Sequence, residues 1–312
     1  MITITKYNVD NKEEWDNFVI NAKNGHFIFC RNYMDYHSDR FVDHSLMFRN
    51  EKEELIAILP ANIRNKLLYS HQGLTFGGII SNTSMKACLM IEVVDTLIHY
   101  LRGAKINKLI YKHIPYSYHS VPSQEDFYAL YQRGAKLSRV DIASTINLQD
   151  KPKFSNGRKD GIRKALRTNL NISKSNDFKS FYSILAERLE LKYSNTPVHS
   201  LYEMELLANR FLDNISLYGA YENNDLVSGV LIYEMNNWAH VQYIASSERG
   251  RNNGALDLIF DKLINEVYIN KNFFNFGISS ESEGRFINSG LISQKEGFGA
   301  RTIVHHFLEL DI

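Results

Sequence analysis

Cysteine is scarce in this chain of 312 residues, which contains only Cys30 and Cys88. Neither has a metal-ligand companion at zinc spacing, so the sequence offers neither a zinc site nor a disulfide framework. We interpret both cysteines as small core residues of a protein from a reducing compartment, and we expect no metal.

Long apolar runs and an excess of one charge are also missing. No segment approaches 18 apolar residues, and residues 1–7 lack the basic region and apolar stretch of an export signal. We therefore expect a cytoplasmic protein without a membrane span. The formal net charge is only +1, so we expect no nucleic-acid partner, and any anion site must be local.

The predicted elements follow a similar order in both halves of the chain: helices, an antiparallel meander, then helix, strand, helix and strand. In the first half, strands are expected at 2–7, 44–48, 54–63, 67–70, 108–114 and 143–148, and helices at 12–20, 31–37, 84–102 and 124–134. In the second half, strands are expected at 217–222, 227–234, 239–245, 273–277 and 302–310, and helices at 157–168, 178–193, 201–213, 254–268 and 285–296.

This duplicated order predicts an α/β (α+β) chain of two tandem domains, 1–150 and 151–312. Each domain should contain a mixed, mainly antiparallel sheet flanked by helices. The boundary is placed where the composition changes after Asp150 to Lys-Pro-Lys-Phe-Ser-Asn-Gly-Arg-Lys-Asp.

The most informative segment is 241–260, where a strand ends in a polar loop and an amphipathic helix is expected to begin near Gly254. Unpaired backbone N–H groups and the positive end of the helix dipole would point at one place, and Arg249 and Arg251 add positive charge. The pattern predicts a pyrophosphate site. An ordinary strand-to-helix loop with solvated arginines is the alternative.

The same segment resembles motif A of the GNAT acetyltransferases. The run Ala245-Ser-Ser-Glu-Arg-Gly-Arg-Asn-Asn-Gly-Ala resembles the tandem-GNAT FemABX-like, or nonribosomal peptidyltransferase, superfamily. The segment Arg251-Asn-Asn-Gly-Ala-Leu departs from the usual (Gln/Arg)-x-x-Gly-x-(Gly/Ala) pattern at its last position, Leu256. Further runs similar to that superfamily are Tyr69-Ser-His-Gln-Gly-Leu-Thr-Phe-Gly-Gly, Tyr111-Lys-His-Ile-Pro-Tyr-Ser-Tyr-His, Arg158-Lys-Asp-Gly-Ile-Arg-Lys-Ala-Leu-Arg, Pro197-Val-His-Ser-Leu, Asn275-Phe-Gly-Ile-Ser-Ser-Glu and Asn288-Ser-Gly-Leu-Ile-Ser-Gln-Lys-Glu-Gly-Phe-Gly-Ala-Arg.

The resemblance implies two tandem GNAT-like domains and an N-acyltransferase that uses acyl-coenzyme A. The branch it is most similar to transfers an acetyl or 3-hydroxybutanoyl type of group to the amine of a dTDP- or UDP-linked amino-deoxy sugar, for surface polysaccharide such as O-antigen or capsule. The donor is then expected at Tyr243, Ala245, Glu248, Arg249, Gly250, Arg251, Asn252, Asn253 and Gly254, with Asn288 and Lys295 reaching its arm or acyl group unless they are surface residues.

Two segments are candidates for binding the sugar nucleotide. In the basic helix, Arg158, Lys159, Arg163 and Lys164 should place much of their charge on one side, for the nucleotide's pyrophosphate or for the 3′-phosphate of coenzyme A, unless this is a solvated face. In the first half, a strand end that either lines a crevice or packs as an aromatic loop supplies Lys112, His113, Tyr116, Tyr118 and His119, to which the resemblance adds His71.

Direct acyl transfer needs a base for the amine, and two residues are candidates. His199 lies in a loop before the capping-box pattern Ser200 to Glu203, and Glu281 follows the strand ending at Gly277. The alternative interpretation of His199 is an ordinary polar residue that makes its hydrogen bonds within the protein and has no catalytic role. Two other functions stay open: a Fem-type transferase that uses aminoacyl-tRNA, and a non-catalytic GNAT-like binding protein.

Overall fold

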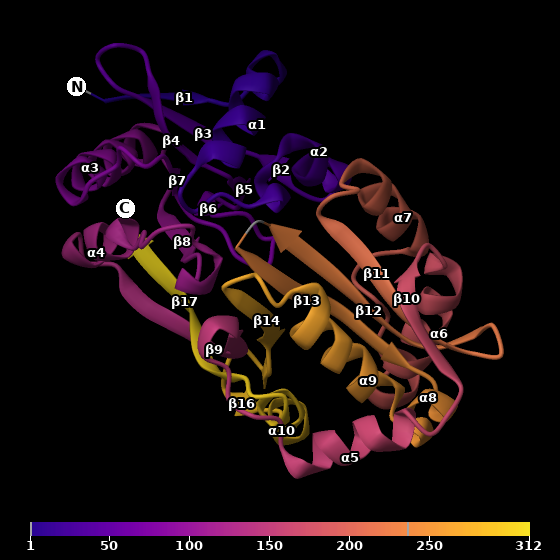
Figure 1. The fold of residues 1–312 in the computed structure, drawn as a ribbon. Helices are drawn as coiled ribbons and strands as arrows, with labels where there is room; N and C mark the ends of the chain where they lie inside the picture. Colours follow the sequence, from indigo (N-terminus) through magenta and orange to yellow (C-terminus); the bar gives the residue numbers. More distant parts are fainter. Residues whose placement is uncertain (1, 236) are drawn as a thin grey trace. The chain divides into compact units, whose positions relative to one another are not determined.

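A computed structural model describes residues 2–235 and 237–312 (Figure 1). Contacts divide the chain into two compact units: unit 1 contains Met1–Ile142, Ser282–Phe286 and Val304–Ile312, and unit 2 contains Ala143–Glu281 and Ile287–Ile303. The sequence places the boundary at residue 150, whereas the contacts change within strand β9 (Lys136–Asn147). The last strand returns to unit 1, because its residues Phe307–Asp311 pair with Lys108–Lys112.

Unit 1 contains two sets of paired strands. One sheet has the order β1-β3-β4-β7 and is antiparallel, and in the other set β17, β8, β6, β5 and β2 are neighbours in that order, with β6 parallel to β8. The single strand expected at 54–63 is two strands, because Pro60 has no N–H to donate to a ladder. The strands are β1 (Thr3–Lys6), β2 (Val42–Asp43), β3 (Leu46–Arg49), β4 (Leu55–Leu59), β5 (Asn62–Arg64), β6 (Leu67–Tyr69), β7 (Ile80–Ser81), β8 (Lys108–Lys112) and β17 (Arg301–Asp311), and the helices are α1 (Lys12–Asn21), α2 (Arg31–Met34), α3 (Ala87–Gly103) and α4 (Glu125–Gln132).

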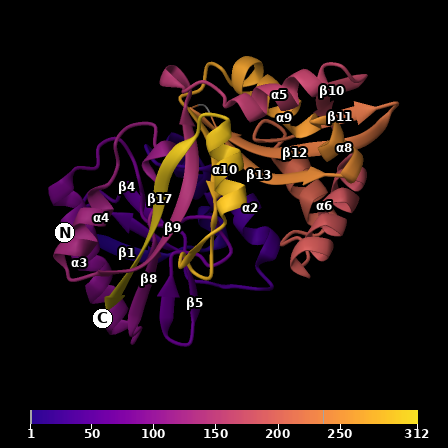
Figure 2. The ribbon, with the colours of Figure 1, turned by 90° about the horizontal axis from the view of Figure 1, so that it is seen from below.

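Unit 2 is built on an antiparallel meander, β10-β11-β12-β13, with β14 parallel to β13 and β9 antiparallel to β14. Figure 2 shows α6 on one face of β12 and β13, with α9 and α5 on the other side. The α/β class, with mainly antiparallel sheets flanked by helices, is therefore confirmed. The elements are β10 (Leu170–Ser175), β11 (Ile215–Glu222), β12 (Asp225–Met235), β13 (Trp238–Ser246), β14 (Phe273–Ile278), α5 (Asn156–Ala165), α6 (Phe178–Tyr193), α7 (Leu201–Arg210), α8 (Glu248–Asn253), α9 (Ala255–Lys262) and α10 (Ser289–Gly297), and the short strands β15 (Ser280–Glu281) and β16 (Phe286–Ile287) lie between β14 and α10 in the sequence.

Strands β13 and β14 pair over a short distance only. The recorded pairs join residues 238–240 to residues 273–275. Beyond them, the register of β13 against β12 shifts around Gln242, and the register of β14 against β9 shifts around Gly277, whose φ of 71° favours glycine. The carboxyl end of β13, up to Ser246, therefore pairs with β12 alone.

The helix expected at 254–268 begins six residues earlier than predicted. Ser247 caps α8, since its hydroxyl accepts a hydrogen bond from the Gly250 N–H at 3.1 Å. Gly254, with φ of 77°, then separates α8 from α9. The helix expected at 285–296 begins at Ser289, where the Asn288 side chain caps it.

Two glycines bring α5 against the corner between α8 and α9. A Cβ at Gly254 would lie 2.4 Å from the Gly161 carbonyl oxygen, and a Cβ at Gly161 would lie 1.9 Å from Asp257 Oδ2. Only glycine at both positions permits this approach. Helix α5 is thereby fixed beside the α8–α9 turn (Figure 1).

We expect Gly254→Ala to lower the free energy of unfolding by about 2 kcal/mol or more, because alanine is strained at positive φ and its Cβ would collide with α5. Gly157→Ala, in the same helix α5 with no atom near the added Cβ, is the control and should raise it by roughly 0.5–1 kcal/mol. Denaturant unfolding of both variants checks this. Equal changes in the free energy of unfolding of the two variants would contradict the close approach of α5 to Gly254.

Candidate active site

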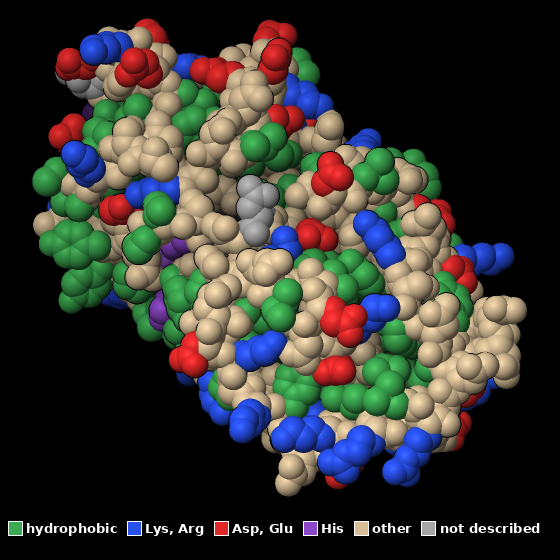
Figure 3. Space-filling view, in the orientation of Figure 1, with side chains coloured by type: hydrophobic (Ala, Val, Ile, Leu, Met, Phe, Trp, Pro, Cys, Tyr) green, Lys and Arg blue, Asp and Glu red, His purple; other side chains and the backbone are tan. Residues whose placement is uncertain are grey.

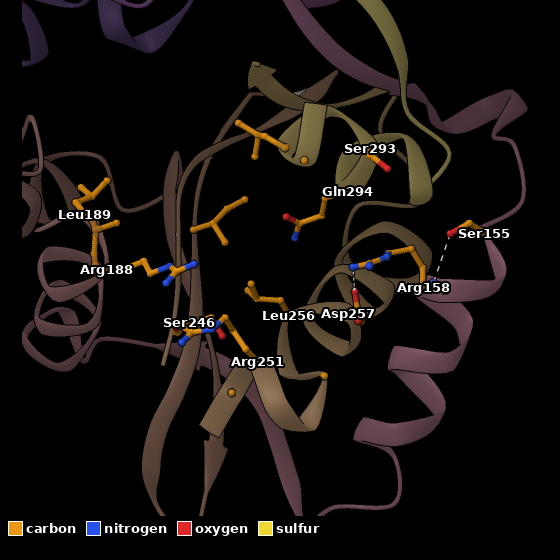
Figure 4. Close-up of a pocket in the computed structure, with 17 residues that line it drawn as sticks. Ser155, Arg158, Arg188, Leu189, Ser246, Arg251, Leu256, Asp257, Ser293 and Gln294 are labelled. Carbon is orange, nitrogen blue, oxygen red and sulfur yellow. Dashed lines mark hydrogen bonds and ion pairs between the residues drawn. The ribbon is translucent and has the colours of Figure 1, made fainter. Parts of the chain in front are cut away.

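A cavity of about 660 Å³ opens in unit 2 at the carboxyl end of β13 (Figure 4). Its walls come from β13, through Ile244 and Ser246, and from helices α5, α6, α8, α9 and α10. We call it the β13 pocket. It lies where β13 no longer pairs with β14, so the parting of the two strands provides the space.

Three arginines enter the β13 pocket from different elements (Figure 4). Arg158 of α5 forms an ion pair with Asp257 of α9, with 2.6 Å between Nη1 and Oδ1. Arg251 of α8 donates from Nη1 to the Ser246 carbonyl oxygen at 2.8 Å. The Arg188 side chain of α6 has no hydrogen bond or ion pair with any residue that the structure describes.

The pocket contains one carboxylate, Asp257, against these three cations. Burial raises the pKa of Asp257, and the Arg158 guanidinium opposes that shift. Even with Asp257 ionised, the charge of the pocket lining is positive. Such a pocket suits a ligand with several negative charges, since guanidinium groups bind phosphate oxygens in bidentate fashion.

The predicted pyrophosphate loop is divided between two hollows. Gly250, Arg251 and Gly254 line the β13 pocket. A separate hollow of about 560 Å³, which also contacts Lys164, is lined by the other four loop residues, Glu248, Arg249, Asn252 and Asn253. Arg251 and Arg249 therefore line different hollows.

Arg249 and two backbone N–H groups of the loop are engaged within the protein. Arg249 forms ion pairs with Glu222 at 3.1 Å and Asp225 at 2.9 Å. The N–H groups of Gly250 and Arg251 donate to the side chain and the carbonyl of Ser247. Positive charge in the β13 pocket thus comes from side chains on three helices, and less from unpaired N–H groups than the sequence predicts.

On β13, the two predicted donor residues alternate with those that line the pocket. The Tyr243 hydroxyl lies 2.7 Å from His199 Nδ1, and Ala245 is buried. Burial raises the pKa of Tyr243 to about 12, so the phenol stays protonated at neutral pH. His199 is itself buried, just before the capping box of Ser200 and Glu203, which the structure contains as predicted.

Lys295 and Asn288 contact the protein itself. The buried Lys295 ammonium donates to the carbonyl oxygens of Gly277 at 2.9 Å and Ile278 at 2.7 Å, and to Ser279 Oγ at 2.8 Å. Asn288 caps α10 and donates from Nδ2 to Glu281 at 2.8 Å. Lys295 therefore holds the end of β14 to α10, and Glu281 is an exposed carboxylate positioned by Asn288.

In unit 1, five of the six predicted substrate residues lie largely within the core. His71 and His119 have pKa values lowered by burial to about 3 and about 4, so both are neutral at pH 7. Lys112 donates from Nζ to the Leu74 carbonyl oxygen at 2.7 Å. Tyr118 is buried, and Tyr116 is about half exposed.

His113 belongs to a buried polar cluster with Tyr111 and Asp126. Its Nε2 lies 3.4 Å from Asp126 Oδ1, and the Tyr111 hydroxyl donates to Asp126 and accepts from the Ile79 N–H at 2.6 Å. These three side chains are almost completely buried. The cluster places Asp126 between the Tyr111 hydroxyl and the His113 ring, so a buried carboxylate has polar neighbours on both sides, as buried charged groups require.

The basic helix α5 spreads its charge over several directions, not one side. Arg158 faces the β13 pocket, Lys159 and Arg163 line a third hollow of about 470 Å³ together with Phe154, and Lys164 lines the hollow beside Arg249. Successive residues of an α-helix are rotated by about 100° around its axis, so the side chains of α5 face three different hollows.

Sequence reasoning missed several residues of the pocket. Arg188 and its neighbours Leu185 and Leu189 lie on a helix whose packing against β13 no local pattern reveals. Ser293 and Gln294 come from the middle of α10. The one available signal was the spacing of Leu185, Arg188 and Leu189, which puts all three on one face of α6.

The fold is similar to that of FemX and of other solved proteins, as comparisons with known structures show. The crystal structure of FemX matches with a TM-score of 0.72 over 99% of this chain and 97% of that chain, at 10% sequence identity. The C-terminal domain of a putative lysylphosphatidylglycerol synthetase from Agrobacterium fabrum matches with a TM-score of 0.65 over 97% and 92%, at 11% identity. A conserved protein of unknown function from Bacteroides thetaiotaomicron has a TM-score of 0.66 over the full length of both chains, at 11% identity.

No protein-family model and no curated protein matches the sequence. Among residues 2–235 and 237–312, no helix is both long and apolar enough to cross a membrane. The same residues contain no group of three histidine, cysteine, aspartate or glutamate side chains arranged to hold a metal ion.

Lys295 predicts a measurable pH dependence of stability. Burial lowers its pKa from 10.5 to about 7, so between these values the unfolded chain binds a proton that the folded chain does not. The free energy of unfolding should therefore rise with pH in this window. Relative to Lys295→Met, which cannot titrate, the native protein should gain at least about 1 kcal/mol between pH 7 and pH 9 by chemical denaturation. If the free energy of unfolding of the native protein and of Lys295→Met changed with pH in the same way, the pH dependence could not be assigned to Lys295.

Proposed function

We propose that this chain is an N-acyltransferase that takes its acyl group from acyl-coenzyme A bound in the β13 pocket. The observation that carries the proposal is the convergence of Arg158, Arg188 and Arg251 on one cavity at the open end of β13. Coenzyme A presents a pyrophosphate and a 3′-phosphate, which suit this cationic lining. The FemX-like fold supports a transferase.

Acyl transfer from a thioester to an amine requires only that the two reactants are oriented and that a group accepts the proton of the amine. The acceptor amine attacks the thioester carbonyl, a C–N bond forms, the C–S bond breaks, and the thiolate leaves and takes up a proton. Backbone N–H groups between Tyr243 and Ala245 are proposed to polarise the carbonyl. Orientation of the two reactants supplies most of the rate enhancement, so no covalent enzyme intermediate is needed.

We assign the base to Glu281, with His199 as the other candidate. Glu281 is exposed and is held by Asn288, the cap of a helix whose first turn lines the β13 pocket. His199 is buried against Tyr243, behind the strand residues that face the pocket. An exposed, oriented carboxylate is accessible to an incoming amine, whereas a buried imidazole is enclosed by the protein.

The acceptor proposed is a dTDP- or UDP-linked amino-deoxy sugar, in a cytoplasmic step of surface-polysaccharide synthesis. The segments of the chain that resemble sugar N-acyltransferases support this choice. The transferred group is then of the acetyl or 3-hydroxybutanoyl type.

A second candidate is a Fem-type transferase that uses aminoacyl-tRNA. The match to FemX over nearly the whole chain favours it. The net charge of +1 opposes it, because capture of a long polyanion relies on an extended positive surface.

The first test measures donor binding and turnover together. Isothermal calorimetry should detect coenzyme A, and Arg188→Ala and Arg251→Ala should each weaken it roughly 10- to 100-fold, since each removes a charge-assisted contact. Arg249→Ala is the matched control, because its guanidinium faces another hollow, and should change affinity less than about twofold. Thiol release from acetyl- or 3-hydroxybutanoyl-coenzyme A should depend on one sugar nucleotide of a dTDP and UDP panel. Absence of binding by the native protein would sink the proposal.

The base assignment predicts that Glu281→Gln lowers kcat by about 100-fold while leaving the affinity for coenzyme A unchanged. Thiol-release kinetics measured against pH check this, and the pH dependence of kcat should flatten in the variant. His199→Ala should mainly lower the thermal unfolding temperature, since it removes the partner of Tyr243. The reverse pattern would transfer the role to His199.

A further inference from the structure

The stretch 151–167 carries far more positive charge than the rest of the molecule. It contains seven lysines and arginines and one acid, Asp160, for a net charge of +6. Because the whole chain has a net charge of +1, the remaining residues sum to −5. Figure 3 shows lysine and arginine side chains gathered over α5.

Most of these cations are not used by the fold. Lys153, Lys159, Lys164 and Arg167 form no side-chain hydrogen bond or ion pair with any residue that the structure describes. Arg163 pairs only with Asp160, and both side chains are more than 60% exposed. Like charges left together on one short helix repel one another, so the fold itself gains nothing from them.

Binding of free acyl-coenzyme A in the β13 pocket does not explain the lysines and arginines of this stretch that lie outside the pocket. Of the lysines and arginines in this stretch, only Arg158 lines the pocket, while Lys159 and Arg163 line a different hollow. Leu166 is 67% exposed at the end of the same helix, between Lys164 and Arg167. A cationic ridge with an exposed apolar side chain has the composition of a docking surface for an acidic protein.

We propose that α5, with Leu166 and Arg167, docks an acidic acyl carrier protein that presents its acyl group on a phosphopantetheine arm. The inference rests on the proposed thioester-dependent transfer, since the arm would enter the β13 pocket beside Arg158 at the edge of the same helix. The arm ends in the same thioester as acyl-coenzyme A, so the bonds formed and broken are unchanged. The thiol then stays on the carrier.

The size of the surface favours a small acidic protein over RNA. Helix α5 has ten residues and is about 15 Å long, which matches one acidic helix of a partner. RNA binding uses phosphate contacts spread over a longer surface, whereas outside this stretch the chain is net negative. A docking surface of this size fits a transient, salt-sensitive encounter.

The test compares an acetyl-loaded bacterial acyl carrier protein with acetyl-coenzyme A as donors for the whole protein. The double variant Leu166→Asp/Arg167→Glu should lower kcat/KM for the loaded carrier at least tenfold and leave kcat/KM for acetyl-coenzyme A within twofold. Leu212→Asp/Lys179→Glu makes the same changes at exposed positions elsewhere in unit 2 and should affect neither donor. Binding of the unloaded carrier, followed by fluorescence anisotropy, should weaken as salt is raised.

Each contrary outcome has a separate meaning. No transfer from the loaded carrier, while acetyl-coenzyme A is used normally, overturns the docking surface and leaves the proposed function intact. Equal losses in the two double variants, or tRNA that binds at α5 when the carrier does not, overturn it as well. Failure to bind coenzyme A and to use either donor overturns both proposals.

Discussion

Strand β13 is held by β14 through only three residue pairs, and the candidate site depends on that short pairing. Beyond the pairs, the irregularities at Gln242 and Gly277 let the strands separate. Each side of the opening is then fixed by its own contacts. Helix α8 is seated on β12 and β13 because Gly250 has no Cβ to strike Ser228, and Lys295 ties the end of β14 to α10.

Polar and steric contacts thus hold both sides of the opening. A buried ammonium with three acceptors is costly to remove, since its loss leaves two carbonyls and a hydroxyl without their donor. The side chains that line the pocket come from β13 and five helices, of which α6, α8 and α9 pack on the sheet and α5 packs on α8 and α9. Such a site is largely preformed, so binding requires little reordering of the chain.

Much of the fold could be predicted from the sequence, because periodicity and caps are local signals. The long helices α3 and α6, the meander β11 to β13 and the capping box at Ser200 all lie where the residues indicate. Strand β10 was missed because Leu170-Asn-Ile-Ser-Lys-Ser has little strand propensity and depends on pairing with β11. The early start of α8 was missed because Gly250 and Gly254 suggest a loop, whereas Ser247 caps a helix there.

The candidate site was predictable only in part, because direction and burial of side chains are tertiary properties. The loop after β13 was identified, but nothing local separates Arg251, which faces the pocket, from Arg249, which faces Glu222. Arg188 depends on how α6 crosses the sheet. In unit 1, histidine and tyrosine suggested a ligand crevice, whereas Tyr111 and His113 lie buried beside Asp126 inside the core.

The return of β17 to unit 1 has a consequence for how the polypeptide matures. Leu308 and Leu310 belong to the apolar core that also contains Leu109 and Leu130, and Phe307–Asp311 pair with β8. During synthesis, the first 142 residues leave the ribosome long before the strand that completes them. Until β17 is synthesised, β8 has an open edge, so unit 1 reaches its final form only when nearly the whole chain has been made.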